Sequence, residues 1–181
     1  MHIKHFLQGK IIDLRPLVKE DLNGEYINWL NDAEICQYNS HHVYPYGPNE
    51  AEQYIFSLEN NKNNLVLAII AKDTSKHIGN ISLQKIDYIN RNAEYAVIIG
   101  DKAYHGKGVA KEASLLLIRH GFNSLNLHRI YCGTSSANIA MQKLAIALGM
   151  KEEGRRRQAL YKNGVYFDVS EYGLLREDFK S

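Results

Sequence analysis

The chain has 181 residues, of which 45% are hydrophobic and 23% are charged, and its formal net charge at pH 7 is +2. These values are typical of one globular domain, residues 1–181, and so small a charge gives no support for nucleic acid or an anionic membrane as the main partner. The two cysteines are isolated, and the start of the chain has no signal-peptide pattern, so we expect a reduced, cytoplasmic protein without a membrane span.

The first half of the chain predicts one strand, two helices and three more strands. The strand is expected at 9–17, and apolar spacing predicts a helix at 21–32. A loop rich in aromatic and polar residues follows at 36–48, after which Asn49 and Glu52 form a pair typical of a helix start. Apolar runs and alternation then predict strands at 65–71, 77–86 and 93–99.

The second half alternates helices and strands and ends in a hairpin. A helix follows the glycines at 106 and 108, a strand is expected at 129–134, and a second helix at 135–150 is stopped by Gly149. The dipeptide Asn163-Gly164 predicts a tight turn joining two strands within 159–175. This order of elements predicts a mixed α/β (α+β) domain built around one sheet.

The segment HGKGVA, residues 105–110, lies between a predicted strand and a predicted helix. Successive backbone N–H groups at such a turn bind anions, and glycines allow a phosphate to approach them. The spacing fits neither the nucleotide P-loop, because Lys107 is followed by Gly108, nor the dinucleotide fingerprint, because Lys111 stands where a small residue is needed. A plain glycine-rich turn remains the alternative.

The same hexamer fits the pyrophosphate loop of the GNAT acetyltransferases, with Gly108 and Ala110 matching and His105 replacing the usual Arg or Gln. Similarity continues through the strand carrying Glu94, through 125–154, and into the last strand. From about residue 10 onward the chain is identified as a member of this family and resembles the branch of bacterial ribosomal-protein N-terminal acetyltransferases (the RimJ/RimL type). The resemblance implies one central mixed, mostly antiparallel sheet with helices on both faces and a splay between the fourth and fifth strands.

The resemblance also implies acetyl-CoA as the cofactor. Its pyrophosphate would lie on the backbone of the hexamer, its pantetheine arm would run along the fourth strand, and an asparagine after the fifth strand would contact the arm. The residues implied are Val97, Ile98, Ile99, His105, Gly106, Lys107, Gly108, Val109, Ala110 and Asn138. Asn138 is equally compatible with an ordinary helix N-cap.

Acetyl transfer to an amine requires a neutral nucleophile, a polarised carbonyl and a proton for the departing thiolate. The resemblance points to Glu94 as general base through water, and a structural ion pair of Glu94 with Arg91 or Arg129 is the alternative. Many family members protonate the thiolate with a tyrosine seven residues after the asparagine, but that position is Ala145 here. The general acid is therefore unassigned, and the candidates are Ser135, Ser136, Tyr131 or the reaction intermediate itself.

The acceptor is the least defined part of the prediction. Asp168 would attract the amine or else pair with the arginines at 155–157, which as a group predict a solvated face. Trp29 and His41 fall in the family's acceptor-facing region, although Trp29 also fits a core position, and no metal site is expected because adjacent histidines lack a third ligand.

We therefore expect an N-acetyltransferase that transfers acetyl directly to a primary amine in a ternary complex. The acceptor is either a small amine or amino sugar, or a protein N-terminal α-amine. A non-catalytic acyl-CoA-binding sensor is the alternative, and the resemblance also allows a homodimer.

Overall fold

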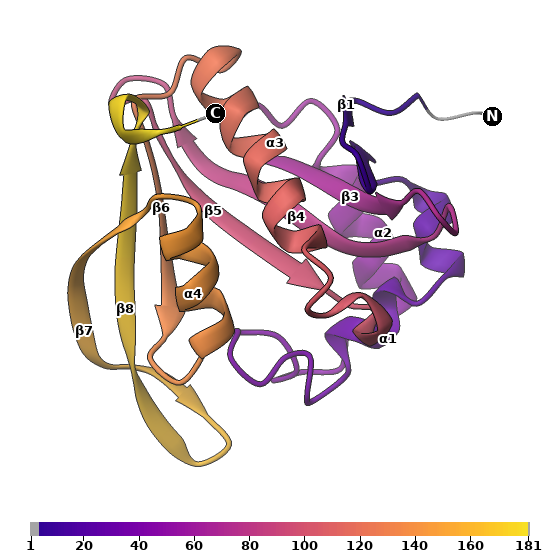
Figure 1. The fold of residues 1–181 in the computed structure, drawn as a ribbon. Coiled ribbons are helices and arrows are strands. Elements are labelled where there is room, and N and C mark those ends of the chain that lie inside the picture. Colours follow the sequence, from indigo (N-terminus) through magenta and orange to yellow (C-terminus); the bar gives the residue numbers. More distant parts are fainter. Residues whose placement is uncertain (1–3, 181) are drawn as a thin grey trace.

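The computed structural model describes residues 4–180 and contains an eight-stranded sheet in the order β1-β2-β3-β4-β5-β6-β8-β7 (Figure 1). The predicted single domain, 1–181, extends beyond this range by residues 1–3 and 181. The strands are β1 (Leu7–Gln8), β2 (Ile12–Pro16), β3 (Leu65–Ala71), β4 (His77–Asp87), β5 (Asn92–Ile99), β6 (Arg129–Ser135), β7 (Lys151–Lys162) and β8 (Val165–Leu175). The helices are η1 (Lys19–Asn23), α1 (Tyr26–Leu30), α2 (Pro48–Ser57), η2 (Lys102–Tyr104), α3 (Val109–Asn123), α4 (Ile139–Ala147) and η3 (Arg176–Asp178).

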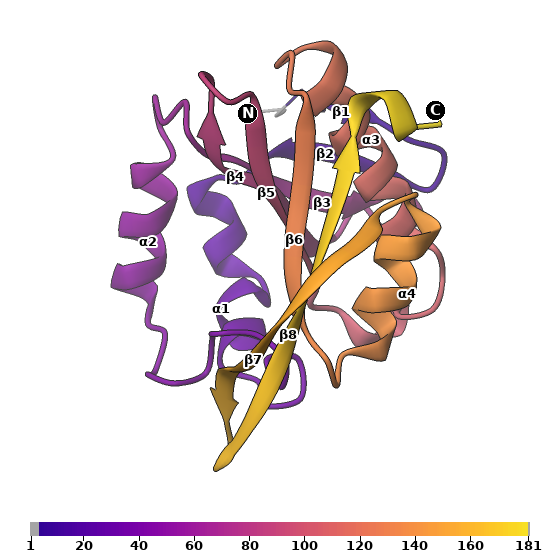
Figure 2. The same ribbon diagram turned by 90° about the vertical axis from the view of Figure 1, so that its left-hand side faces the viewer.

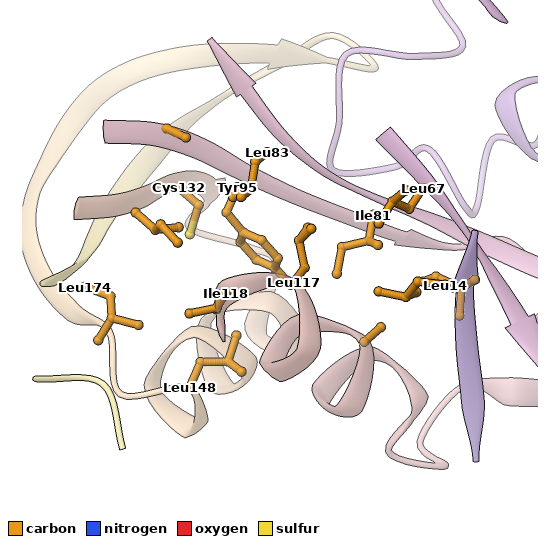
Figure 3. Close-up of a cluster of buried hydrophobic side chains, with 14 of the residues drawn as sticks. Leu14, Leu67, Ile81, Leu83, Tyr95, Leu117, Ile118, Cys132, Leu148 and Leu174 are labelled. Atoms are coloured by element: carbon orange, nitrogen blue, oxygen red, sulfur yellow. The ribbon is translucent and has the colours of Figure 1, made fainter. Parts of the chain in front are cut away.

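Helices cover both faces of the sheet, as predicted. Seen along the sheet, α1 and α2 lie on one side and α3 and α4 on the other (Figure 2). The larger core lies under α3 and α4, where Tyr95, Leu83 and Leu117 meet (Figure 3). A smaller core around Trp29 and Ala68 lies under α1 and α2. Within residues 4–180, none of the helices is long and apolar enough to span a membrane.

The predicted splay separates β5 from β6, which are the fourth and fifth strands of the prediction. These two strands pair in parallel only where Asn92, Ala93 and Glu94 face Arg129, Ile130 and Tyr131. Beyond that point they diverge (Figure 1), while β4 stays paired with β5 and β8 stays paired with β6 over their lengths. The remaining pairs in the described sheet are antiparallel, so the predicted fold class is confirmed.

Several element boundaries differ from the prediction for local reasons. The helix expected at 21–32 is divided into η1 and α1 around Gly24. The helix α2 begins at Pro48 with Gly47 as its N-cap, so the Asn49 and Glu52 capping pair is wrong. Proline at the first helical position needs no backbone N–H there, which explains the earlier start.

The terminal hairpin is longer than predicted. Strand β7 begins at Lys151, well before the expected 159, because an edge strand exposed on both faces has no apolar alternation to reveal it. The turn itself is as predicted: Asn163 and Gly164 have φ of 51° and 83°, the left-handed pair that a two-residue hairpin turn requires. Gly149, with φ of 87°, ends α4 as expected.

Candidate active site

The N-terminus of α3 forms a concave turn built on two glycines. Gly106 and Gly108 have φ of 72° and 80°, and a Cβ added at either position would meet nothing within 4 Å. The glycines are therefore required by the left-handed backbone, and the space beside them is open.

Several backbone donors of this turn have no acceptor within residues 4–180. The N–H groups of His105 and Lys107 donate to carbonyls of η2, at 3.2 and 3.4 Å. The N–H groups without an acceptor belong to Gly106, Gly108, Val109, Ala110 and Lys111. Because α3 is 15 residues long, its dipole adds positive potential at the same place. The residues present therefore fit a pyrophosphate group.

The diverging edge of β5 provides a second set of backbone groups. The N–H of Gly100 donates to Ile78 of the preceding strand segment at 2.9 Å, so alternate peptide groups of β5 face β4. By this alternation the peptide of Ile98 also faces β4, whereas those of Val97 and Ile99 face the gap toward β6. The carbonyl of Ile99 accepts a hydrogen bond from the His105 ring at 2.9 Å. Of the three predicted strand residues, Val97 and Ile99 thus present backbone to the gap and Ile98 does not.

Asn138 stands at the other side of the gap, where β6 leads into α4. Its side-chain oxygen accepts the N–H of Met141 at 3.1 Å, so it is the N-cap of α4. Its Nδ2 group has no hydrogen-bond partner in the described part of the chain, which leaves one polar group available beside the gap.

A cavity of about 580 Å³ lies at the gap on the α1 and α2 face of the sheet. Backbone and side chains from both diverging strands line it, including Val97 and Ser135. The loop before α2 and the terminal hairpin form the outer walls, with His41 and Arg156 among their residues. The cavity therefore lies at the gap between β5 and β6, on the face of the sheet opposite α3, and both polar and apolar groups line it.

The inner wall is a row of polar side chains on β4 that sequence reasoning missed. Asn80, Ser82 and Gln84 all line the cavity. They alternate with buried Ile81 and Leu83, so a central strand carries one polar face. This period-two pattern of polar residues inside the sheet was the signal available in the sequence, because a central strand normally buries apolar residues on both faces.

Glu94 lines the cavity next to the last point of contact between β5 and β6. Its carboxylate lies 2.7 Å from the ammonium of Lys85, and this hydrogen bond and charge raise the pKa of Lys85. The alternative ion-pair partners predicted for Glu94 are wrong: Arg91 bonds to Asn126, and Arg129 pairs with Glu153.

Asp168 lies outside the cavity lining and does not pair with the arginine run. Its carboxylate accepts the N–H of Gln158 at 2.9 Å, and its carbonyl accepts the N–H of Ser136 at 2.8 Å. Gln158 has φ of 48° within the irregular part of the β7–β8 pairing, so Asp168 stabilises a bulge in the hairpin. Residues Arg155, Arg156 and Arg157 are exposed, as predicted for a solvated face.

Trp29 is a core residue and does not line the cavity. Its side chain is 5% exposed, and the Gly100 backbone lies so close that an added Cβ would be 1.9 Å from the indole. The core alternative therefore holds for Trp29, and its predicted contact with substrate is corrected; His41 lines the cavity.

The candidate positions for the general acid differ in whether they lie near the cavity. Ala145 is fully buried in the larger core, so the position that often carries tyrosine faces away from the cavity. Ser135 lines the cavity, and Tyr131 is half-buried on β6 directly opposite Glu94 in the strand pairing.

Within residues 4–180 the cysteines do not provide a reactive thiolate, and the histidines do not form part of a metal site. Burial raises the pKa of the Cys132 thiol to about 12, and Cys36 is also buried with a raised pKa. Both remain protonated at neutral pH and are poor nucleophiles. Among residues 4–180 no group of three or more His, Cys, Asp or Glu side chains is placed to hold a metal ion.

The fold, the anion-binding turn and the gap define the acetyltransferase (GNAT) domain, whose family model matches residues 12–151. The chain belongs to this family and is an N-acetyltransferase of the acyl-CoA-dependent type, with acetyl-CoA as its cofactor.

Its relatives act on different acceptors. The chain is 34% identical over 102 residues to a putative ribosomal N-acetyltransferase, YdaF of Bacillus subtilis, covering 56% of this chain and 55% of that one. It is 30% identical to a spermidine N(1)-acetyltransferase of Vibrio cholerae, covering 93% and 95% of the two chains. A crystal structure of the Vibrio cholerae spermidine N-acetyltransferase with CoA and spermine has a TM-score of 0.86 at 27% identity, covering 94% of this chain and 98% of that one.

Proposed function

We propose that the chain transfers the acetyl group of acetyl-CoA directly to a primary amine held in the cavity. The observation that carries the proposal is the gap between β5 and β6. It lies between the N–H groups at the start of α3, which have no acceptor within residues 4–180, and the cavity that Glu94 lines. A donor held at the turn can therefore reach an acceptor on the other face only through this gap.

Glu94 is the proposed general base, acting through water on the acceptor ammonium. The neutral nitrogen then attacks the thioester carbonyl carbon, the carbon–sulfur bond breaks, and the nitrogen loses its second proton, which restores the group that protonates the thiolate to the CoA thiol. The N–H of Val97, which faces the gap, is the proposed donor that polarises the carbonyl oxygen. Lys85 holds the Glu94 carboxylate on the cavity wall and leaves its second oxygen for water.

The proton for the thiolate comes from a group near the gap. Ser135 and Tyr131 are the candidates that lie there, and Ala145 is excluded by its burial. A covalent acetyl-enzyme is not part of the proposal, because both cysteines are buried thiols away from the cavity lining. Asn138 Nδ2 and the Ile99 backbone are proposed contacts for the pantetheine arm.

The cavity favours a small amine over a protein N-terminus. Its volume of about 580 Å³ lies within the usual range for small-molecule sites, about 300–1,000 Å³. The loop that contains His41 and the hairpin strand β7 are tied together by Lys162, whose ammonium donates to the carbonyls of Asn39 and His41. A peptide would have to separate these two walls.

Thiol release from acetyl-CoA across a panel of amines and N-terminal peptides tests the proposal. Glu94→Gln is expected to lower kcat by at least about 100-fold, the usual contribution of a general base, with CoA affinity unchanged. Glu177→Gln on the exposed segment η3 is the matched control and should retain activity. Unchanged turnover in Glu94→Gln would remove Glu94 as the base, and CoA binding without turnover on any acceptor would favour the acyl-CoA sensor.

A further inference from the structure

The charge around the acceptor cavity is unusual for an enzyme related to polyamine acetyltransferases. Among the described residues that line the cavity, Glu94 carries the only carboxylate; Glu171 lies just outside the lining, over Gly133, where an added Cβ would lie 3.1 Å from the Glu171 carboxylate. Each is already paired with a cation. Glu94 contacts Lys85 at 2.7 Å, and Glu171 contacts Arg156 at 2.6 Å.

The other titratable side chains that line the cavity add no negative charge. Burial raises the pKa values of Tyr26, Tyr46 and Tyr54, so these lining phenols are neutral at pH 7. Desolvation of the ring and the charge of Lys162 lower the pKa of His41, so this imidazole is also neutral. Lys162 itself adds a positive charge behind the loop. The described side chains that line the cavity therefore supply one negative charge, Glu94, which is paired with Lys85, and one positive charge, Arg156.

Arg156 has hydrogen-bonding capacity left over. Only its Nε donates to Glu171, and the Nη groups have no partner within residues 4–180. Its side chain is 63% exposed, and it lines the cavity from β7. A guanidinium in this arrangement can offer its free edge to a carboxylate or phosphate of a bound ligand.

A polyamine does not match this distribution of charge. In a polyamine every further ammonium would lie near the cations Lys85 and Arg156 and would find no unpaired carboxylate among the described residues of the lining, and like charges near one another are unfavourable. An amine that also carries an anion satisfies both ends, because its ammonium approaches Glu94 while its anion meets the free edge of Arg156.

We propose that the acceptor is a small primary amine bearing an anionic group, a carboxylate or a phosphate, and that Arg156 binds this group. The inference rests on the proposed acetyl transfer and specifies its acceptor class. It separates this chain from the spermidine acetyltransferases to which it is similar.

Matched amines with and without the anion test the inference. The carboxylate arm compares 4-aminobutyrate with butylamine, and the phosphate arm compares O-phosphoethanolamine with ethanolamine, with spermidine as the polycation. In a thiol-release assay the anionic member of at least one pair should have a kcat/KM at least about tenfold higher than its partner, as expected for hydrogen bonds to a charged group. The arm with the larger ratio identifies the anion. The inference would be overturned if spermidine, butylamine or ethanolamine had a higher kcat/KM than both anionic amines.

Substitution of Arg156 separates recognition from structure. Arg156→Gln should raise KM for the better anionic amine by about tenfold or more with little change in kcat, because the residue binds the tail and not the reacting atoms. The same substitution leaves Glu171 without its cation, so spermidine should become a better acceptor. Arg157→Gln, at the exposed neighbouring position that does not line the cavity, is the control.

If Arg156→Gln lowered kcat/KM equally for every acceptor, Arg156 would only support the hairpin. The inference about the acceptor would then be wrong, and the proposed acetyl transfer would be unaffected. Absence of turnover with all amines and peptides would instead remove the proposed function itself.

Discussion

The glycine turn at α3 allows a test in which backbone strain and charge are separated. Gly108 is the N-cap of α3 with φ of 80°, and a Cβ there meets nothing within 4 Å. Gly108→Ala and Gly108→Glu therefore have the same backbone cost, and neither has a collision at its Cβ. A non-glycine residue in this conformation costs about 1–2 kcal/mol. For a chain of this length each kcal/mol lowers Tm by about 2–4 °C, so both variants should melt a few degrees below the wild type.

The two variants should differ strongly in CoA affinity. A glutamate at this position places a negative charge against the diphosphate, and two unit charges about 4 Å apart at an effective dielectric constant of 20 repel by about 4 kcal/mol. With partial screening by solvent, about 3 kcal/mol remains, which corresponds to a rise in Kd of about 100-fold. Alanine adds only a methyl group, and its effect should stay below about tenfold.

Titration calorimetry with CoA measures these affinities, and S-acetylpantetheine serves as the control donor because it lacks the diphosphate. Acetyl transfer from S-acetylpantetheine should be similar in the wild type and both variants. Equal weakening of CoA binding by alanine and glutamate would show that strain and not charge is responsible. Wild-type CoA affinity in Gly108→Glu would place the pyrophosphate elsewhere.

Two further predictions concern buried charges. Burial alone would raise the pKa of Asp21, but hydrogen bonds from Arg15, from His77 and from a backbone N–H outweigh it and hold the pKa well below its usual value. This stability is present above the unfolded-state pKa of about 4 and is lost as the pH falls below it. Asp21→Asn should lower the free energy of unfolding, measured with urea at pH 7, by about 3 kcal/mol. The difference from wild type should shrink toward pH 3, and a difference that stays constant with pH would contradict a stabilising role for the Asp21 charge. Lys162→Met removes the ammonium that donates to the carbonyl of His41. The KM for the acceptor should therefore rise by about tenfold, with the affinity for CoA unchanged. An equal loss of CoA affinity would mean that Lys162 supports the whole fold instead.

The sequence was sufficient for the parts of the site that depend on local backbone. Asn163 and Gly164 required a left-handed turn, and the glycines at 106 and 108 required an open turn before a helix, which the φ values confirm. These signals are readable because a positive φ is a property of one residue and its neighbours.

Side chains brought together from distant elements were not predicted. The alternative ion pair of Glu94 was expected with Arg91 or Arg129, but the partner is Lys85, whose φ is 50° at an irregular point of the β4–β5 pairing. Trp29 had a core alternative that only packing against Gly100 could decide. Strand β7 was underestimated because an exposed charged edge strand has no hydrophobic period.

This division between local and distant determinants explains why family membership identifies the donor but not the acceptor. The proposed contacts to the donor are backbone groups at the α3 turn and the β5 edge, which many side chains can surround without changing the geometry. The acceptor cavity depends on side chains from β4, the loop before α2 and the terminal hairpin, joined through Lys162. Side chains of the hairpin such as Arg156 and Glu171 could be exchanged for others, which would change the charge beside the cavity without altering the sheet. The proposed selection of an amine that carries its own anion is therefore compatible with a fold shared with spermidine acetyltransferases.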